Sequence, residues 1–298
     1  MMLKRMLKDL LRRPKIPIAS PRVRAEELVA KALRASHQGD DELAARCGRE
    51  ALELAPDFAG AHTLLASLEL RGEYYLRVLK RIHAYLRPAT YVEIGVYVGE
   101  SLALSYEGAD SIGIDPEPRI QHALTPRTRV YAETSDAFFA KRNLREEFGG
   151  RPVELAFIDG MHHFEFALRD FMHLEACCSE DSTILLHDCY PLDENTAARE
   201  RRTDFWSGDV WRAVLALKKY RPGLSIATIA APFTGLALVR GLDPASGVLR
   251  EGIDDIVAEM MSVPFASLGP RKSEMLNLVP GDWPSVQKLL PVPRRQPA

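Results

Sequence analysis

The spacing of hydrophobic positions divides the chain into two parts of different character. Across residues 25–86, apolar side chains recur at helical intervals, with breaks at Gly39, Pro56 and Gly72. Residues 90–240 instead alternate short β-rich runs with helical ones, which is the pattern of a parallel sheet with helices on both faces. We therefore expect an α/β domain preceded by a small α-helical region.

Seven runs in the second part have the length and composition of strands. They are residues 90–95, 110–115, 128–132, 153–158, 182–187, 224–230 and 234–240. The last two runs are too close in sequence to enclose a helix, so they must form an antiparallel hairpin. The predicted fold is a doubly wound, mostly parallel sheet of seven strands that ends in this hairpin.

Prolines and changes of pattern divide the chain into four segments. Residues 1–24 predict a basic amphipathic helix and a linker, and residues 243–298 predict a C-terminal extension with one further helix at 253–261. Charges interrupt the apolar face of residues 1–13, so we expect neither a secretory signal nor a membrane span there. This helix has two alternative roles. One is packing on the protein itself, and the other is docking to a membrane surface or a partner.

The helical region, residues 25–87, resembles one and a half tetratricopeptide repeats. Ala44, Ala51, Pro56 and the Leu65-Ala66 pair stand where such repeats place small packing residues, a closing proline and the start of the next helix. About three repeats are needed for a self-standing solenoid. We therefore expect these helices to pack on the α/β domain or on a partner, either as a homo-oligomer or protein interface or as a plain helical cap.

Composition narrows the class of protein. The 298 residues carry a net charge of −2 and are 46% hydrophobic and 27% charged, which does not favour a nucleic-acid-binding protein. The four cysteines lack a Cys-x-x-Cys spacing, and a chain of this size does not need disulfides to fold. We expect reduced thiols and a cytoplasmic location.

A nucleoside site is predicted around the first strand. The stretch from Tyr91 to Ser101 is a strand, then a turn with Gly95 and Gly99, then the start of a helical pattern. Gly95 allows a turn where a Cβ would clash, and Gly99 allows close approach to the backbone. Asp115 ends the second strand twenty positions after Gly95, where a carboxylate reaches ribose hydroxyls.

The glycine spacing favours a nucleoside without phosphates. A nicotinamide cofactor would need Gly-x-Gly-x-x-Gly, whereas residues 95–99 read Gly-x-x-x-Gly, and Glu93 adds a negative charge that suits a cationic ligand. S-adenosyl-L-methionine carries a sulfonium and an ammonium and no phosphate. Through Glu93-Ile94-Gly95, Gly99 and Asp115 the chain resembles the class I S-adenosylmethionine-dependent methyltransferases. A strand–helix turn of any α/β protein is the alternative.

That resemblance implies a set of cofactor-binding residues. They are Glu93, Gly95, Gly99, Ser101 and Asp115, together with Ser135 and Asp136 beside the adenine ring. Thr134 or Ser135 would serve equally well as a helix N-cap.

Acids and histidines follow the fourth and fifth strands. Asp159 and His162 come after the fourth strand, and His187 and Asp188 end the fifth. The carboxyl ends of parallel strands meet at one crevice, where two carboxylates could share Mg²⁺ and an imidazole could act as a general base. A turn, a helix cap and surface histidines are the structural alternatives.

This second motif resembles the macrocin and mycinamicin type of sugar O-methyltransferases. It comprises Phe157-Ile158-Asp159-Gly160-x-His162 and, about thirty residues on, Leu186-His187-Asp188. The resemblance implies that Asp159 and Asp188 bind Mg²⁺ and that His162 is the catalytic base. It also implies that Asp159 is a catalytic residue. His187 stands where members carry an acid, and imidazole suits manganese, iron or zinc better. The predicted metal set is therefore Asp159, His187 and Asp188, with Mg²⁺ or another divalent ion.

We expect an S-adenosylmethionine-dependent O-methyltransferase for a small hydroxylated acceptor of the sugar or natural-product type. Residues 191–208 are long enough to form a lid over the crevice, or only a solvated charged run. The alternative is a non-catalytic protein that binds a partner through its helical region. A nicotinamide-dependent oxidoreductase is disfavoured by the glycine spacing and the closing hairpin.

Overall fold

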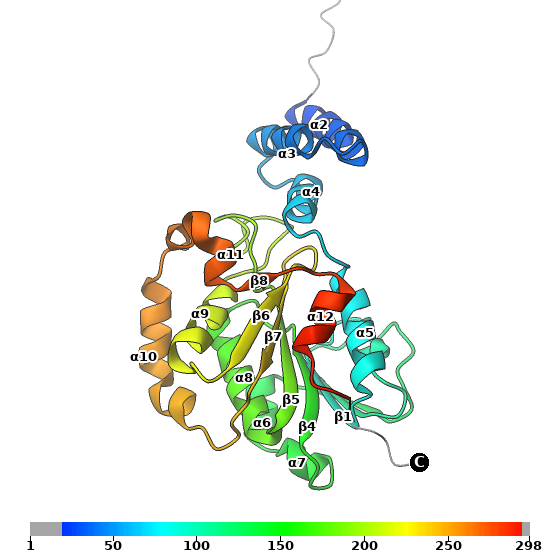
Figure 1. Cartoon of the computed structure of the whole chain (residues 1–298), viewed down its shortest axis with the longest axis vertical. Helices are drawn as coiled ribbons and strands as arrows, with labels where there is room; N and C mark the ends of the chain where they lie inside the picture. The colour runs from blue at the N-terminus through cyan, green and yellow to red at the C-terminus, as the bar shows by residue number, and fades with distance from the viewer. Residues whose placement is uncertain (1–19, 294–298) are drawn as a thin grey trace, which may run out of the picture. The chain divides into compact units, whose positions relative to one another are not determined.

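The computed structural model describes residues 20–293 (Figure 1). These residues fall into two compact units, the first ending at Leu65 and the second beginning at Ala66. The predicted helix at residues 1–13 lies outside the described residues. The predicted helical region, residues 25–87, is divided between the two units. Its last helix belongs to the larger one.

The smaller unit contains α2 (Pro21–His37), α3 (Asp41–Leu54) and the first part of α4 (Ala59–Glu69). Helix α3 begins where the Asp40 carboxylate accepts a hydrogen bond from the Leu43 amide at 3.0 Å, directly after the left-handed Gly39. The core of this unit consists mostly of alanines, whose small side chains let the helices approach closely. The predicted helices and their breaks are confirmed. The likeness to tetratricopeptide repeats remains a prediction.

The larger unit is built on one sheet of eight strands in the order β3-β2-β1-β4-β5-β7-β6-β8 (Figure 1). The strands are β1 (Thr90–Ile94), β2 (Asp110–Asp115), β3 (Thr128–Ala132), β4 (Val153–Ile158), β5 (Cys178–His187), β6 (Ser225–Ile229), β7 (Leu236–Arg240) and β8 (Leu278–Val279). Strands β1 to β5 pair in parallel, while β7 is antiparallel to both β5 and β6. The predicted fold class and closing hairpin are confirmed.

The eighth strand was not predicted. Strand β8 comes from the C-terminal extension and pairs in parallel with β6, with Leu278 opposite Thr228. Two residues are too short for an alternating pattern, so the sequence carries no strand signal there.

Side chains alternate between the two faces of the sheet, and each face has its own hydrophobic core. In β4, Ala156 and Ile158 join the core shared with α8 (Phe164–Cys177), whereas Leu155 and Phe157 join the core shared with α5 (Tyr75–Leu86). The remaining helices and turns are η1 (Leu102–Leu104), α6 (Ser135–Phe139), α7 (Leu144–Glu147), α9 (Trp211–Tyr220), α10 (Val248–Ser262), η2 (Phe265–Ser267), η3 (Gly269–Arg271), α11 (Lys272–Met275) and α12 (Trp283–Leu289).

The helix expected after Gly99 is wrong, because only the 3₁₀ turn η1 separates β1 from β2. Leu102 is fully buried, and a Cβ added at Gly113 of β2 would lie 2.7 Å from its side chain. Leu102 therefore packs on the sheet where the helix was expected, and the segment there forms a single 3₁₀ turn.

The C-terminal extension contributes to the larger unit rather than only covering it. Its first helix, α10, is longer at both ends than the expected 253–261, and Val286 of α12 lies in the core on the α5 face.

All four cysteines are free and buried. Within residues 20–293, none of the helices combines the length and apolarity that crossing a bilayer requires.

Candidate functional site

A cavity of about 920 Å³ lies at the carboxyl ends of β1, β2, β4 and β5 in the larger unit. This is the crevice where open parallel sheets bind ligands. Its lining comes from the loops after these strands and after β3, and from α5 and α8. The residues are Tyr75, Ile94, Gly95, Val96, Tyr97, Val98, Glu100, Ser101, Ile114, Asp115, Pro116, Thr134, Ser135, Asp136, Asp159, Gly160, Met161, His162, Phe166, Asp170, His187, Asp188 and Arg201.

The loop after β1 is shaped by Gly95 and Asp115. Gly95 has φ +88°, and a Cβ there would lie 2.1 Å from the Asp159 carbonyl oxygen, so only glycine fits. The Asp115 carboxylate accepts hydrogen bonds from the amides of Val96 (2.9 Å), Tyr97 (2.8 Å) and Glu117 (2.7 Å). A carboxylate has about four acceptor positions, so Asp115 retains capacity for a ligand while it fixes the loop.

Two of the predicted cofactor residues do not line the cavity. Glu93 is fully buried and accepts hydrogen bonds from the Tyr91 hydroxyl (2.7 Å) and the Ser101 hydroxyl (2.6 Å). Burial raises the pKa of Glu93 to about 8, so the carboxyl is mostly uncharged at neutral pH. The role of Glu93 toward a cationic ligand stays a prediction; in this structure its carboxyl is bound by two hydroxyls and lies outside the cavity lining. Gly99 faces Ile120, whose side chain would lie 3.1 Å from an added Cβ.

Thr134, Ser135 and Asp136, which follow β3, line the cavity, but their contacts differ from the predicted ones. The Thr134 hydroxyl accepts from the Ala137 amide at 3.2 Å and caps α6, which leaves Ser135 free of that task. The Asp136 carboxylate receives two hydrogen bonds from the Arg169 guanidinium, at 3.1 and 2.7 Å. Asp136 is therefore engaged by Arg169.

Asp170 of α8 is a cavity residue that sequence reasoning missed. It is only 3% exposed, it lines the cavity, and its carboxyl shares a hydrogen bond with Ser135. Burial raises the pKa of Asp170 to about 7. An acid in the middle of an amphipathic helix predicts a solvent-facing position, so the sequence contained no signal for this burial.

Four residues after β4 and β5 form a contiguous polar group, which we call the cavity cluster: Asp159, His162, His187 and Asp188. His162 Nε2 lies 3.0 Å from Asp188 Oδ2. His187 Nδ1 lies 3.0 Å from Asp159 Oδ1 and 3.4 Å from Asp188 Oδ2. The structure thus brings the two acids and two histidines together, with each imidazole against a carboxylate.

The cavity cluster balances its charges internally. Burial lowers the pKa of His162, but the Asp188 carboxylate outweighs this effect and raises the pKa to about 9. The pKa of His187 is also raised, because Asp159 and Asp188 outweigh its burial. Burial raises the pKa of Asp188, but the two imidazoles lower it further, and the result lies below the usual range. His162 therefore favours its protonated form in this state, with Nε2 directed at Asp188.

Asp159, His162 and Asp188 could together hold a metal ion. Their ligand atoms lie within 4.8 Å of one another, the spacing expected for a shared ion. One imidazole nitrogen and two carboxylates suit Mn²⁺, Fe²⁺ or Zn²⁺ better than Mg²⁺, which prefers oxygen ligands. This group differs from the predicted one, because it contains His162 in place of His187.

His187 is instead held between protein groups. Its ring packs on Tyr75 of α5 at 4.1 Å between centroids, and its Nε2 lies 3.3 Å from the Thr234 hydroxyl. Tyr75 also lines the cavity. It precedes the first strand of the sheet in sequence, so its place in the site could not be predicted from the motifs.

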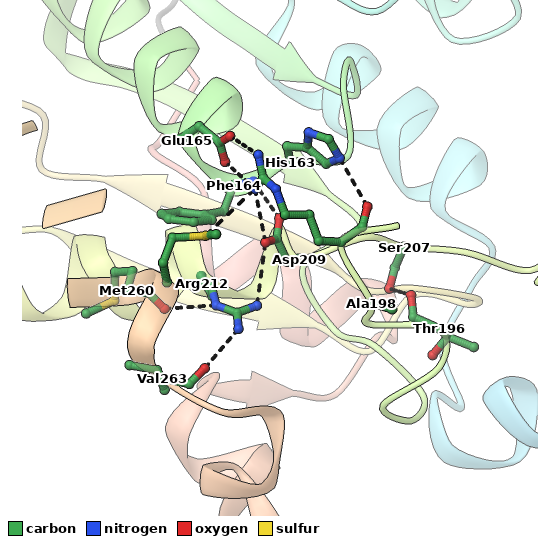
Figure 2. A network of polar contacts seen from close by, with 12 residues as sticks. His163, Phe164, Glu165, Thr196, Ala198, Ser207, Asp209, Arg212, Met260 and Val263 are labelled. Atoms are coloured by element: carbon green, nitrogen blue, oxygen red, sulfur yellow. Dashed lines mark hydrogen bonds and ion pairs between the residues drawn. The ribbon is translucent and has the colours of Figure 1, made fainter. Parts of the chain in front are cut away.

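The connection from residue 191 to 208 is fastened by a second charged group, which we call the loop network: Glu165, Arg199, Asp209 and Arg212 (Figure 2). The Arg199 guanidinium pairs with Glu165 at 2.8 Å and lies 3.4 Å from Asp209. Asp209 is almost fully buried, accepts a hydrogen bond from the Phe164 amide at 2.9 Å and lies 3.6 Å from Arg212. Arg212 donates to the carbonyls of Met260 and Val263, each at 2.9 Å (Figure 2).

This connection forms one wall of the site. The Trp206 ring stacks on His162 at 5.0 Å with an interplanar angle of 19°, and its carbonyl lies 3.2 Å from His162 Nδ1. A Cβ at Gly208 would lie 1.9 Å from the His162 carbonyl oxygen, so the two segments touch. Arg199 is thus part of a largely buried network rather than of a solvated charged run.

Comparison with known proteins links the central part of the larger unit to methyl transfer. Residues 92–189, about a third of the chain, match the family model described as a methyltransferase domain. The match runs from β1 to just after β5 and contains the whole cavity cluster. No curated protein matches the chain.

Solved structures with similar folds share little sequence with the chain. Cofactor-bound Rv0187 from MTB is 16% identical over 63% of this chain and 94% of its own, with a TM-score of 0.44. An O-methyltransferase from Bacillus cereus in complex with SAH is 13% identical over 80% and 96%, with a TM-score of 0.39. An O-methyltransferase family protein from Burkholderia thailandensis is 12% identical over 75% and 72%, with a TM-score of 0.42. These likenesses are too distant to inform the site.

Proposed function

We propose that the chain is an S-adenosylmethionine-dependent O-methyltransferase that acts on a small hydroxylated acceptor, such as a sugar or a natural product. Most of the cavity lining lies within residues 92–189, the segment that matches a methyltransferase domain. The observation that carries the proposal is the charge of the cavity lining. Six carboxyl groups line it, namely Glu100, Asp115, Asp136, Asp159, Asp170 and Asp188, against three cationic groups, the Arg201 guanidinium and the imidazoles of His162 and His187.

This charge balance favours a cationic ligand without phosphates. The sulfonium and ammonium of S-adenosylmethionine are attracted by an acidic cavity, whereas the pyrophosphate of a nicotinamide cofactor would be repelled. The loop after β1 adds to the argument, because Val96, Tyr97 and Val98 occupy the lining where Gly-x-Gly-x-x-Gly would expose amides to a pyrophosphate. We place the ribose near Asp115 and the methionine part along the backbone near Gly95.

The acceptor would enter from the side of the cavity cluster. A second hollow of about 920 Å³ shares Met161, His162 and Arg201 with the cavity, and Trp206 lines it as well. Methyl transfer is an in-line displacement, so the protein mainly has to hold the acceptor oxygen against the methyl group. The Trp206 ring and the Arg201 guanidinium offer an aromatic surface and a cation for a polar acceptor.

Asp159 and His162 would handle the acceptor's proton. Both line the cavity and have partly exposed side chains, and His162 also lines the second hollow. His162 holds a proton at Nε2 toward Asp188 in this state, so it must lose that proton before it accepts another. A bound sulfonium favours this loss, because a nearby positive charge lowers the pKa of an imidazole.

A divalent metal ion is an alternative to this use of His162, because an imidazole nitrogen that binds a metal cannot also accept a proton. Asp159, His162 and Asp188 would hold the ion, and their donor set fits Mn²⁺, Fe²⁺ or Zn²⁺ better than Mg²⁺. Such an ion would orient the acceptor and lower the pKa of its hydroxyl. His187 would then hold the two carboxylates in position from the opposite side, since it contacts both of them.

A transfer assay tests the proposal. The full chain is incubated with methyl-labelled S-adenosylmethionine and a panel of sugars, glycosides and phenols, and the Asp159→Ala chain serves as the control. We expect label on a hydroxyl of at least one acceptor with the wild-type chain and at least about 100-fold less with the variant. Donor binding without transfer to any hydroxylated compound would favour the non-catalytic, partner-binding alternative.

A further inference from the structure

One almost completely buried acid of the cavity, Asp170, has no ion-pair partner among residues 20–293. Its hydrogen-bond partner is the neutral Ser135 hydroxyl. The Arg169 guanidinium, which acts on it electrostatically, is bound by Asp136 through two hydrogen bonds. A carboxyl buried without a cation destabilises a fold. Packing therefore does not explain why this position carries an acid.

The surroundings of Asp170 suit a flat, mostly apolar ligand. The cavity is also lined by Ile114 and Pro116 at the end of β2 and by Phe166, one turn before Asp170 on α8. The order β3-β2-β1-β4-β5 places the ends of β2 and β3 on the opposite side of β1 from β4 and β5, whose ends carry the cavity cluster. This side of the cavity is therefore available to a part of the ligand that does not react.

A buried carboxyl that holds its proton both donates and accepts a hydrogen bond. Burial raises the pKa of Asp170 to about 7, so a large fraction of the chains carry this proton at neutral pH. The complementary ligand group has an acceptor beside a donor. The N1 and the 6-amino group of adenine have this arrangement, and they lie on the edge of a planar ring that fits an apolar slot.

We propose that Asp170 recognises the adenine ring of the methyl donor, with its carboxyl donating to N1 and accepting from the 6-amino group. The assignment rests on the proposed function. It differs from the sequence-based expectation, in which Ser135 and Asp136 had this role. Both carboxylate oxygens of Asp136 receive bonds from Arg169, and its side chain is 46% exposed. Ser135 would position Asp170 through their shared hydrogen bond.

Calorimetric titration of the full chain with two ligands tests the assignment. One ligand is S-adenosylhomocysteine, and the other is its analogue without the 6-amino group. Asp170→Leu is expected to lower the affinity for S-adenosylhomocysteine roughly 10- to 100-fold, because the ring's polar edge then lacks partners. Asp170→Asn keeps a donor and an acceptor, so its affinity is expected to stay within about threefold.

Titration of both ligands against both chains forms a double-mutant cycle, which isolates the contact between Asp170 and the 6-amino group. Removal of the amino group is expected to weaken binding about tenfold in the wild-type chain but less than about threefold in Asp170→Leu. Glu175→Gln is the matched control. Glu175 is also buried on α8, but it pairs with Arg221 away from the cavity, so this variant should bind both ligands as the wild type does.

A purely structural role makes a different prediction. It would lower the melting temperature of Asp170→Leu, whereas the assignment expects an unchanged or higher one, since a desolvated acid is removed. Equal affinity of wild type and Asp170→Leu, or an equal effect of the amino group in both, would overturn the assignment. If the wild-type chain fails to bind S-adenosylhomocysteine, the proposed function fails first. Should Asp170→Leu not fold, Asp170→Ala takes its place in the same comparison.

Discussion

The cavity cluster and the loop network are two buried charged groups that lie beside the same connection, residues 191–208. Each contains an almost fully buried aspartate, Asp188 in the first and Asp209 in the second. In the loop network the cations are guanidinium groups, which keep their protons at all ordinary pH values. In the cavity cluster the cations are imidazoles, and the group opens on a cavity of about 920 Å³.

This difference separates a structural group from a reactive one. Asp209 is surrounded by the Phe164 amide, Arg199 and Arg212, so its charge is fully used inside the protein. Asp159 is paired with His187 but still lines the cavity. Burial and strong pairing therefore do not identify the site, because both groups have them. The site is identified by protons that can exchange and by access to a ligand.

The largest effect should come from the cavity cluster. Asp159→Ala is expected to lower turnover about 100- to 10,000-fold, the range for loss of a group that handles the reacting proton. Affinity for S-adenosylhomocysteine should change less than about threefold, because the residue acts on the acceptor side. Steady-state kinetics and calorimetry measure the two quantities. A loss of affinity equal to the loss of turnover would place Asp159 in donor binding instead.

The matching change in the loop network should affect stability instead of turnover. Asp209→Asn removes a buried charge that faces two arginines, so the free energy of unfolding should fall by about 3 kcal/mol. Chemical denaturation measures this fall. Turnover of the folded fraction is expected within about threefold of wild type. A 100-fold loss of turnover with unchanged stability would make the two groups functionally alike.

A third buried acid, Glu93, has neither a cation nor cavity access. Its folded pKa of about 8 exceeds the ordinary value of 4.5, so the unfolded chain releases the proton first. Stability due to this group is full below about pH 4.5 and declines as the pH rises toward 8. Glu93→Gln should abolish this decline, which is worth about 2.5 kcal/mol between pH 5 and pH 7. Parallel stability curves for both chains over this interval would show that Glu93 is charged in the folded state.

The smallest expected effect concerns a metal ion. A chelator is expected to lower turnover about tenfold, which corresponds to about 1.4 kcal/mol, and Mn²⁺ should restore it better than Mg²⁺. Asp159→Ala removes one of the three candidate ligands, so the melting temperature of an Asp159→Ala chain should not respond to the chelator. Equal turnover with and without the chelator would exclude a metal at the cavity cluster.

The sequence predicted the sheet well, for an identifiable reason. Strands such as β4 are short apolar runs bounded by turns, and their burial pattern follows from local residue choice alone. The ends of β4 and β5 carry Asp159 and Asp188, and strand ends meet at one edge of a parallel sheet. The convergence of these acids therefore followed from topology.

The rest of the site depends on tertiary packing. Asp170 lies on the buried face of α8, and Tyr75 comes from a helix that precedes the sheet, so no local pattern assigns either to the cavity. The pKa of Glu93 is set by burial contributed by the whole fold. The choice between His162 and His187 as a metal ligand depends on the directions of two imidazole rings, which sequence spacing does not specify.

The central claim is that the acidic cavity binds a cationic nucleoside without phosphates. Titration of the wild-type chain with S-adenosylmethionine, S-adenosylhomocysteine and NAD in parallel tests it most directly. The account predicts saturable binding of the first two at one site per chain and no measurable heat from NAD. Binding of NAD in preference to both sulfur nucleosides, or no binding of either sulfur nucleoside, would contradict it.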